Sequence, residues 1–199
     1  ATVYTGIDFG KWNFQNKVTK SESKTVITCV SRLRPRKGHK YLFKALALIK
    51  DQLENVEVRI VGDGEMKKTL KKQVSKLKLK NVTFLGSRDD IPKLLSESDI
   101  FVLPTTSDTL PISIIEAMFT NQAILTTNCG GIPEIIKDNY SGFIVEPANP
   151  EQLAKKLSLL LRKDSIRKEL AGNANAFALQ HLTVSKMVQK IEEIYQSLL

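Results

Sequence analysis

A basic segment at residues 31–40 is the first place in this chain where residue types and spacing could do chemistry. It follows an apolar run at 25–30, leads into a helical pattern, and contains Arg32 and Lys37. A basic loop that opens a helix combines side-chain cations, free backbone N–H groups and the positive end of the helix dipole, which together bind phosphates. The same composition also suits a solvated loop, and charge alone leaves both interpretations open.

Two carboxylates eight positions apart form a second candidate. Asp108 precedes the apolar segment 112–119, and Glu116 lies within it, so both could face one crevice and accept hydrogen bonds from sugar or ribose hydroxyls. The alternative is one carboxylate that complements a helix dipole and one exposed glutamate, and spacing does not choose between these interpretations.

Glycines mark two other loops. Gly62 and Gly64 give GxG, but Lys67 stands where a dinucleotide fingerprint needs its third glycine, and there is no GxxxxGK[ST] motif. These departures disfavour a NAD enzyme and a P-loop NTPase. The pair Gly130 and Gly131, followed by Pro133, is typical of a helix start and by itself indicates nothing more.

The elements that must position these residues follow from hydrophobic patterning. Short, near-continuous apolar runs alternate with helical spacing, which predicts a parallel sheet covered by helices on both faces. The fold class is therefore α/β, a Rossmann-like, doubly wound, six-stranded sheet, and its ligand is expected at the carboxyl ends of the strands. The expected strands are 25–30, 56–62, 82–86, 99–104, 122–127 and 141–146. A final amphipathic helix is expected from Val184.

Composition bounds the class of protein. The chain has 199 residues, a formal net charge of +9, 42% hydrophobic and 26% charged residues, which fits one globular domain at 25–199 after a polar lead-in at 1–24. Cys29 and Cys129 cannot form a disulfide framework, and zinc-ligand spacings are absent. No apolar run reaches the length of a membrane span, so we expect a cytoplasmic domain.

The two histidines and a lysine block complete the candidates. His39 follows Gly38 and could donate a hydrogen bond to an anion, but an exposed histidine at a helix start is the commoner case, and we expect that here. We expect His181 to be structural. The lysines from Lys67 to Lys80 lie opposite an apolar helical face, which is usually a solvated surface. They could also attract anionic lipid headgroups, which favours a peripheral position at the inner face of the membrane.

Five segments, in order, resemble the C-terminal, nucleotide-sugar-binding domain of family-4 glycosyltransferases, which have the GT-B fold. They are VSRLRPRKG, IVGDGEMK, VTFLGSRDDIPKLL, DIFVLPTTSDTLPISIIEAM and NCGGIPEIIKDNYSGFIVEPANPEQLA. Each motif is weak alone, but five in register are specific. The resemblance covers roughly residues 25–199, and TGID near the start is similar to the segment with which such enzymes leave their N-terminal domain.

The resemblance implies roles for individual residues. Arg32 and Lys37 would hold the donor diphosphate and stabilise its charge as it leaves. Glu116 matches the second glutamate of the family's E-x7-E pattern, expected on the ribose, and Asp108 matches the first, expected on hydroxyls of the transferred sugar. Aspartate in place of glutamate shortens that carboxylate by one methylene.

Backbone contacts to the donor are implied as well. Thr109, Leu110 and Pro111 occupy the family's usual Gly-Phe-Pro, so a threonine side chain stands where the backbone should approach the ligand. Other positions that the resemblance places near the nucleotide are Gly62, Gly64, Gly86 and Arg88.

The function implied is transfer of a hexose or similar sugar from a nucleoside diphosphate sugar to a glycan or lipid-linked acceptor, as in surface polysaccharide synthesis. Such enzymes retain the anomeric configuration and need no metal or cofactor, and their acceptor-binding N-terminal domain is absent from this chain. Two alternatives stay open. One is a basic module that binds nucleic acid or another polyanion, which is disfavoured because aromatic residues do not interleave the basic blocks. The other is a nucleotide-binding domain that has lost transfer. Nucleic acid is not an expected partner.

Overall fold

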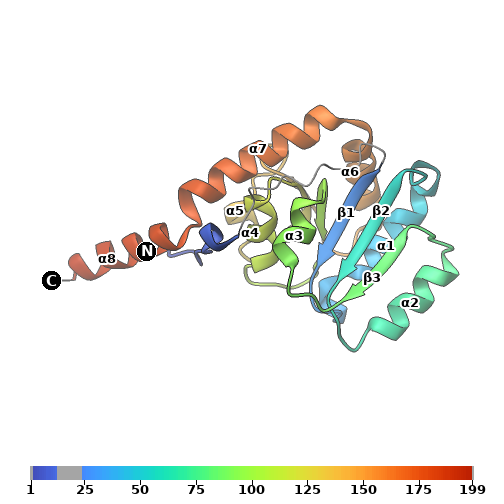
Figure 1. Cartoon of the computed structure of the whole chain (residues 1–199), viewed down its shortest axis with the longest axis horizontal. Helices are drawn as coiled ribbons and strands as arrows, with labels where there is room; N and C mark the ends of the chain where they lie inside the picture. Colours follow the sequence, from blue (N-terminus) through green and yellow to red (C-terminus); the bar gives the residue numbers. More distant parts are fainter. Residues whose placement is uncertain (1, 13–23, 199) are drawn as a thin grey trace.

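The six apolar runs form one parallel sheet in the computed structural model, which describes residues 2–12 and 24–198 (Figure 1). Its strand order is β3-β2-β1-β4-β5-β6, the order of a Rossmann fold. The strands are β1 (Thr25–Val30), β2 (Val56–Val61), β3 (Val82–Gly86), β4 (Ile100–Leu103), β5 (Ala123–Thr127) and β6 (Phe143–Val145). The predicted fold class is therefore confirmed.

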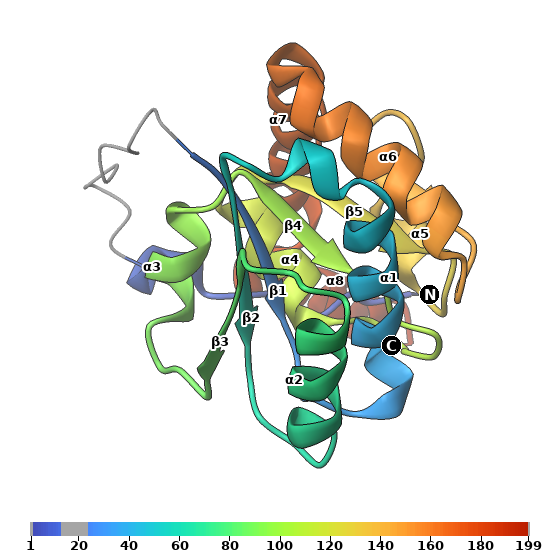
Figure 2. The same cartoon turned by 90° about the vertical axis from the view of Figure 1, so that its right-hand side faces the viewer.

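Helices cover both faces of the sheet. One layer contains α1 (His39–Leu48), α2 (Lys67–Lys76) and α6 (Pro150–Arg162), with α1 packed between the other two. The opposite layer contains α3 (Ile91–Ser96), α4 (Ile112–Phe119) and α7 (Asp164–His181) (Figure 2). The short helix α5 (Ile132–Ile135) connects β5 to β6, and α8 (Val184–Gln196) follows α7.

The core explains why the strands are apolar on both faces. Every residue of β4 and β5 is buried, and Ile27, Phe101 and Ile124 are fully inaccessible to solvent. Central parallel strands have no solvated face, so they lack the polar alternation of an exposed strand.

The end of the chain differs from its prediction, because α7 is a long helix that the sequence pattern does not reveal. Its buried residues are Leu170, Ala171, Ala174 and Ala178. Small alanines allow close packing against α4 and β5 but give a weak apolar stripe. The predicted amphipathic helix from Val184 is present as α8.

The lead-in segment is only partly described, since residues 13–23 lie outside the described part of the chain. Residues 2–12 pack against the domain. The Ile7 amide donates to the Leu182 carbonyl at 2.9 Å, and the Phe9 ring stacks on Phe119 with centroids 4.6 Å apart. In Figure 1 this segment runs beside the start of α8, at one end of the molecule.

Candidate functional site

The basic loop and the Asp108 loop meet where the strand order reverses. β1 and β4 are neighbours in the sheet, and the chain leaves them in opposite directions, so the loops after them flank the position at which such sheets bind ligands. The carbonyl of Arg36 accepts hydrogen bonds from the Thr106 amide at 2.7 Å and from the Thr105 hydroxyl at 3.0 Å. Two segments almost seventy residues apart are thereby fixed as one unit.

Gly38 makes this approach possible. It has φ +73°, ends the single turn Pro35–Lys37 and precedes α1. A side chain at this position would collide with the Pro104 carbonyl of the other loop. Glycine meets both the left-handed conformation and the close approach of the two backbones.

An ion pair joins the loops at the centre of the site. The Lys37 ammonium bonds to one carboxylate oxygen of Asp108, and only 13% and 9% of these two side chains are exposed. The Arg36 guanidinium lies 3.4 Å from the other oxygen and donates to the Ser107 carbonyl at 3.0 Å. The structure thus brings together Lys37 and Asp108, two of the predicted site residues, and adds Arg36, which the sequence pattern does not single out.

Arg32 differs from these two basic residues because its side chain is exposed. Within residues 2–12 and 24–198 its guanidinium has no hydrogen-bond or ion-pair partner. Its uncompensated charge lies on the basic loop, where it would attract an incoming anion.

Glu116 is the second carboxylate of the predicted site. It lies on α4 and is half-buried, and burial raises the pKa of its carboxyl because desolvation disfavours the charged form. No described residue donates a hydrogen bond to its carboxylate or forms an ion pair with it. A half-buried carboxylate without an internal partner can accept hydrogen bonds from a bound ligand.

The loop after β2 forms a wall beside the basic loop. The Gly62 amide donates to the Gly86 carbonyl at 2.7 Å, and the Leu33 amide donates to the Asp63 carbonyl at 2.9 Å. What approaches Gly62 and Gly64 closely is the backbone of residues 31–33. The two glycines therefore have a packing role in the chain itself.

Gly86 and Arg88 lie at the end of β3, on the outer side of this wall. A side chain at Gly86 would point into open space, and Arg88 forms an exposed ion pair with Asp90 at 2.7 Å. The nucleotide role predicted for these two residues stays a prediction.

The glycine pair after β5 has a role that its sequence context did not reveal. The Gly131 amide donates to the Thr109 carbonyl at 2.6 Å, and Gly130 has φ +52° with the carbonyls of Asp108 and Thr109 against it. Leu110 packs on the core and Pro111 is buried, while the Thr109 side chain is exposed. The loop after β5 thus packs against residues 108–111 and holds their backbone in place.

His39 contradicts its prediction. It is 1% exposed rather than solvated, and its Nε2 lies 3.2 Å from the Ser31 hydroxyl, while Nδ1 is buried with no hydrogen-bond partner among the described residues. Burial, followed by the nearby Lys37 charge, lowers the pKa of His39 to about 4, so the ring is neutral at physiological pH. His39 does lie at the start of a helix, as predicted, but the first turn of α1 packs its side chain against the end of β1.

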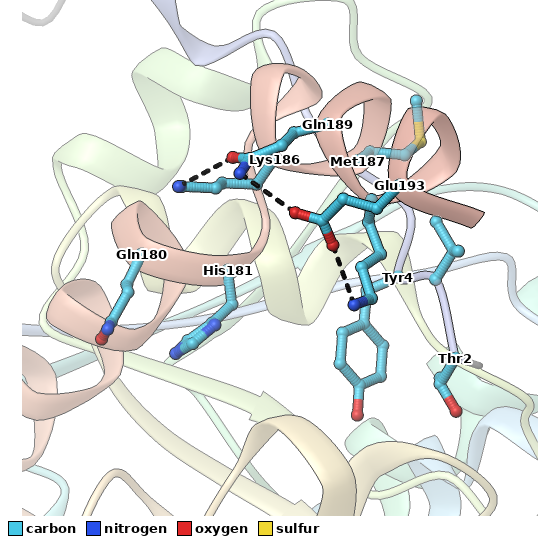
Figure 3. A pocket seen from close by; sticks show the side chains of 10 residues that line it. Thr2, Tyr4, Gln180, His181, Lys186, Met187, Gln189 and Glu193 are labelled. Atoms are coloured by element: carbon cyan, nitrogen blue, oxygen red, sulfur yellow. Dashed lines mark hydrogen bonds and ion pairs between the residues drawn. The ribbon is translucent and has the colours of Figure 1, made fainter. Parts of the chain in front are cut away.

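The described structure also contains two hollows. One, of about 390 Å³, lies between the first residues of the chain and α8, with Tyr4 and His181 on its wall (Figure 3). His181, predicted to be structural, also packs its ring 4.6 Å from that of Phe177. The other, of about 650 Å³, borders α5, β6 and α7. None of Arg32, Lys37, Asp108 and Glu116 lines either hollow.

The described ranges contain no group of three or more metal-ligating side chains. They also hold no helix that is both long enough and apolar enough to cross a bilayer.

The strand order defines a Rossmann-like α/β domain, and the basic loop lies where that order reverses. The comparison with known families is more specific: the family Glycosyl transferases group 1 matches residues 10–177. The chain belongs to this family, whose structurally characterised members here share the GT-B architecture.

Relatives of known function are similar over most of this chain. A Campylobacter jejuni enzyme named N,N'-diacetylbacillosaminyl-diphospho-undecaprenol alpha-1,3-N-acetylgalactosaminyltransferase is 33% identical, over 80% of this chain and 42% of its own length. An Escherichia coli UDP-Gal:alpha-D-GlcNAc-diphosphoundecaprenol alpha-1,3-galactosyltransferase is 31% identical, over 85% of this chain and 45% of its own length. The chain therefore spans about half the length of these curated relatives.

Solved structures agree with this match. HepE from Anabaena, crystallised with UDP-glucose, has a TM-score of 0.85 at 29% identity, over 99% of this chain and 57% of that protein. The C-terminal domain of the group 1 glycosyltransferase LpcC from Francisella tularensis has a TM-score of 0.76 at 24% identity. It matches 92% of this chain and 97% of that domain, which shows a common fold.

Proposed function

We propose that this chain is the donor-binding half of a retaining, metal-independent glycosyltransferase, in which residues 25–199 hold a nucleoside diphosphate sugar. The observation that carries the proposal is the junction of the basic loop with the Asp108 loop at the strand-order reversal. Similarity to HepE, whose structures contain UDP and UDP-glucose, supports a uridine diphosphate hexose as the donor.

The chemistry requires stabilisation of the nucleoside diphosphate as it leaves. Arg32, Lys37 and the backbone at the start of α1 would bind the diphosphate. Fixed cations in a partly buried site stabilise developing negative charge by roughly a few kcal/mol for each donated hydrogen bond. The Glu116 carboxylate would accept the ribose hydroxyls, and Asp108 with the backbone of Thr109 would orient the sugar. No step in this scheme uses a metal ion.

Calorimetric titration of the chain with uridine, UDP and UDP-glucose tests these roles. Lys37→Ala or Arg32→Ala should weaken the binding of UDP far more than the binding of uridine, because only UDP carries the diphosphate. Lys155→Ala is the matched control, since Lys155 is an exposed lysine on α6 without a partner in the described chain. Equal losses for uridine and UDP would remove the phosphate role.

The two carboxylates should separate in the same titrations. Glu116→Gln should weaken the binding of UDP and of uridine alike, whereas Asp108→Asn should weaken binding only when the sugar is attached. Loss of UDP binding in Asp108→Asn would show that this division of roles is wrong.

We further propose that acceptor binding belongs to an N-terminal domain outside this chain, and that residues 1–24 lead from it. The length of the relatives supports this, as does the exposed apolar face of α8, where Val188 is 42% and Tyr195 69% exposed. Residues 1–199 should bind UDP-glucose but form no glycosylated product with a lipid-linked acceptor, since the reacting groups must be aligned to within about 1 Å. Transfer by this chain at the rate of a full-length enzyme would contradict the proposal.

A further inference from the structure

A strongly basic surface lies on α2, outside the basic loop and the Asp108 loop. Between residues 66 and 80 the chain has seven lysines and no acidic residue. The helix itself buries one side chain, Leu70. Packing therefore does not explain why this stretch is so rich in lysine.

Three of these lysines carry charge that nothing in the described structure compensates. Lys68, Lys72 and Lys76 are exposed, and their spacing of four residues places them on one side of the helix. By contrast, Lys67 forms an ion pair with Asp63 at 2.5 Å, and the Lys71 ammonium lies 5.8 Å from the centroid of the Phe84 ring.

The neighbouring helix α1 extends this surface. The Gln73 amide on α2 donates to the Lys40 carbonyl at 3.0 Å, so the helices lie side by side, as Figure 2 also shows. Lys40 and Lys44 are exposed on α1, one turn before Leu48, which is 57% exposed. We call Lys40, Lys44, Lys68, Lys72 and Lys76 the lysine face.

We propose that the lysine face docks this chain onto an anionic lipid bilayer. Basic residues near such a surface each increase membrane partitioning by about fivefold, and exposed apolar side chains such as Leu48 add to it. The choice of a bilayer as the partner rests in part on the proposed function, because the diphosphoundecaprenol acceptors named for the relatives are membrane lipids.

The position of the lysine face relative to the donor loop fits this partner. The Met66 amide, directly before α2, donates to the Leu33 carbonyl of the basic loop at 3.0 Å. A helix of ten residues is about 15 Å long, so every lysine of α2 lies within roughly that distance of the loop along the helix axis. Docking through this face would hold the donor near the headgroup layer, where the diphosphate of a lipid-linked acceptor lies.

Cosedimentation with vesicles tests the proposal on the whole chain. The vesicles are phosphatidylcholine with phosphatidylglycerol as a minor anionic component, and pure phosphatidylcholine provides the neutral control. The triple variant Lys68→Gln, Lys72→Gln, Lys76→Gln should lose about a hundredfold in partitioning at low salt. A matched triple variant, Lys24→Gln, Lys155→Gln, Lys163→Gln, removes the same charge from exposed positions elsewhere and should lose far less.

Binding of wild type should also weaken steeply as ionic strength rises. Equal losses in the two triple variants, or equal binding to neutral vesicles, would overturn the proposal. Tighter binding of the lysine face to an oligoadenylate than to the anionic vesicles would overturn it in favour of a nucleic-acid surface.

The donor site is monitored separately by UDP titration. The lysine-face variant should keep wild-type UDP affinity, which also shows that it is folded, and Lys37→Ala should keep vesicle binding. If neither triple variant loses vesicle binding, the docking surface is refuted. If Lys37→Ala keeps its UDP binding, the proposed function is refuted.

Discussion

Gly130→Ala is the substitution that tests most directly whether the loop after β5 supports the candidate sugar site. A Cβ at Gly130 would lie 2.6 Å from the Thr109 carbonyl oxygen, and closer still to that of Asp108, where an ordinary contact begins at 3.4 Å. The Thr109 oxygen must therefore move by about 0.8 Å or more. Gly130 cannot yield by itself, because the Gly131 amide is bonded to the same carbonyl.

Two costs add for this variant. The left-handed φ of +52° costs a residue with a side chain about 1–2 kcal/mol, and the displaced loop adds to this. Hydrogen bonds have a usable range of only a few tenths of an ångström, so a shift of this size removes those that residues 108 and 109 offer to a sugar. Losing one bond to a charged group corresponds to about 1.5–3 kcal/mol, so UDP-glucose affinity should fall by roughly ten- to a hundredfold while UDP affinity changes little.

Two other glycines separate these costs in urea unfolding. Gly86→Ala has a comparable φ of +72° but open space around it, so its stability shows the backbone cost alone. Gly172→Ala lies within α7 with nothing near it and should stabilise the chain by about 0.5–1 kcal/mol. If Gly130→Ala is as stable as Gly86→Ala and binds UDP-glucose as well as wild type, the inferred support of Asp108 and Thr109 is refuted.

Two pH effects follow from buried titratable groups. Burial raises the pKa of Glu116 above 4.5, so the stability linked to its protonated form is present below that pH and is lost as pH rises through the folded-state value. Glu116→Gln should therefore be more stable than wild type at neutral pH in urea unfolding, although it binds UDP less well, and an unchanged pH profile would contradict this. The lowered pKa of His39 acts in the opposite direction: stability is present above 6.5 and is lost as pH falls toward about 4. His39→Gln should flatten this acid limb of the unfolding profile, and a profile that stays as steep would show that another group causes it.

The sheet could be predicted from the sequence because each strand is short, apolar and buried on both faces. Ile27 and Phe101 have no solvent exposure, and runs of such residues between helical segments leave few other architectures. The ends of these strands then indicate the loops in which the ligand-binding residues must lie. The long helix α7 escaped prediction because its buried face consists largely of alanine, which carries little hydrophobic signal.

The candidate site could be predicted as a set of residues but not as a set of contacts. Lys37 and Asp108 are 71 positions apart, and the distance between them depends on which strands are neighbours. The role of Gly130 likewise depends on a loop from β5 crossing beneath residues 108 and 109. His39 shows the same limit, because helical spacing places it at the start of α1 but does not show whether that end of the helix is buried.

The contacts also suggest why a donor with both a diphosphate and a sugar suits this site. In the free chain the Lys37 charge is already neutralised by Asp108, whereas Arg32 has no partner among the described residues. A diphosphate alone would compete with Asp108 for Lys37 and leave a carboxylate of low exposure with only the more distant Arg36 guanidinium, which is costly. A sugar offers hydroxyl groups to that carboxylate, so that Lys37 can turn to the phosphate while Asp108 stays hydrogen-bonded. Under the proposed function, sugar and diphosphate therefore bind cooperatively. The diphosphate takes the place of Asp108 as the partner of Lys37, and the sugar takes the place of Lys37 as the partner of Asp108.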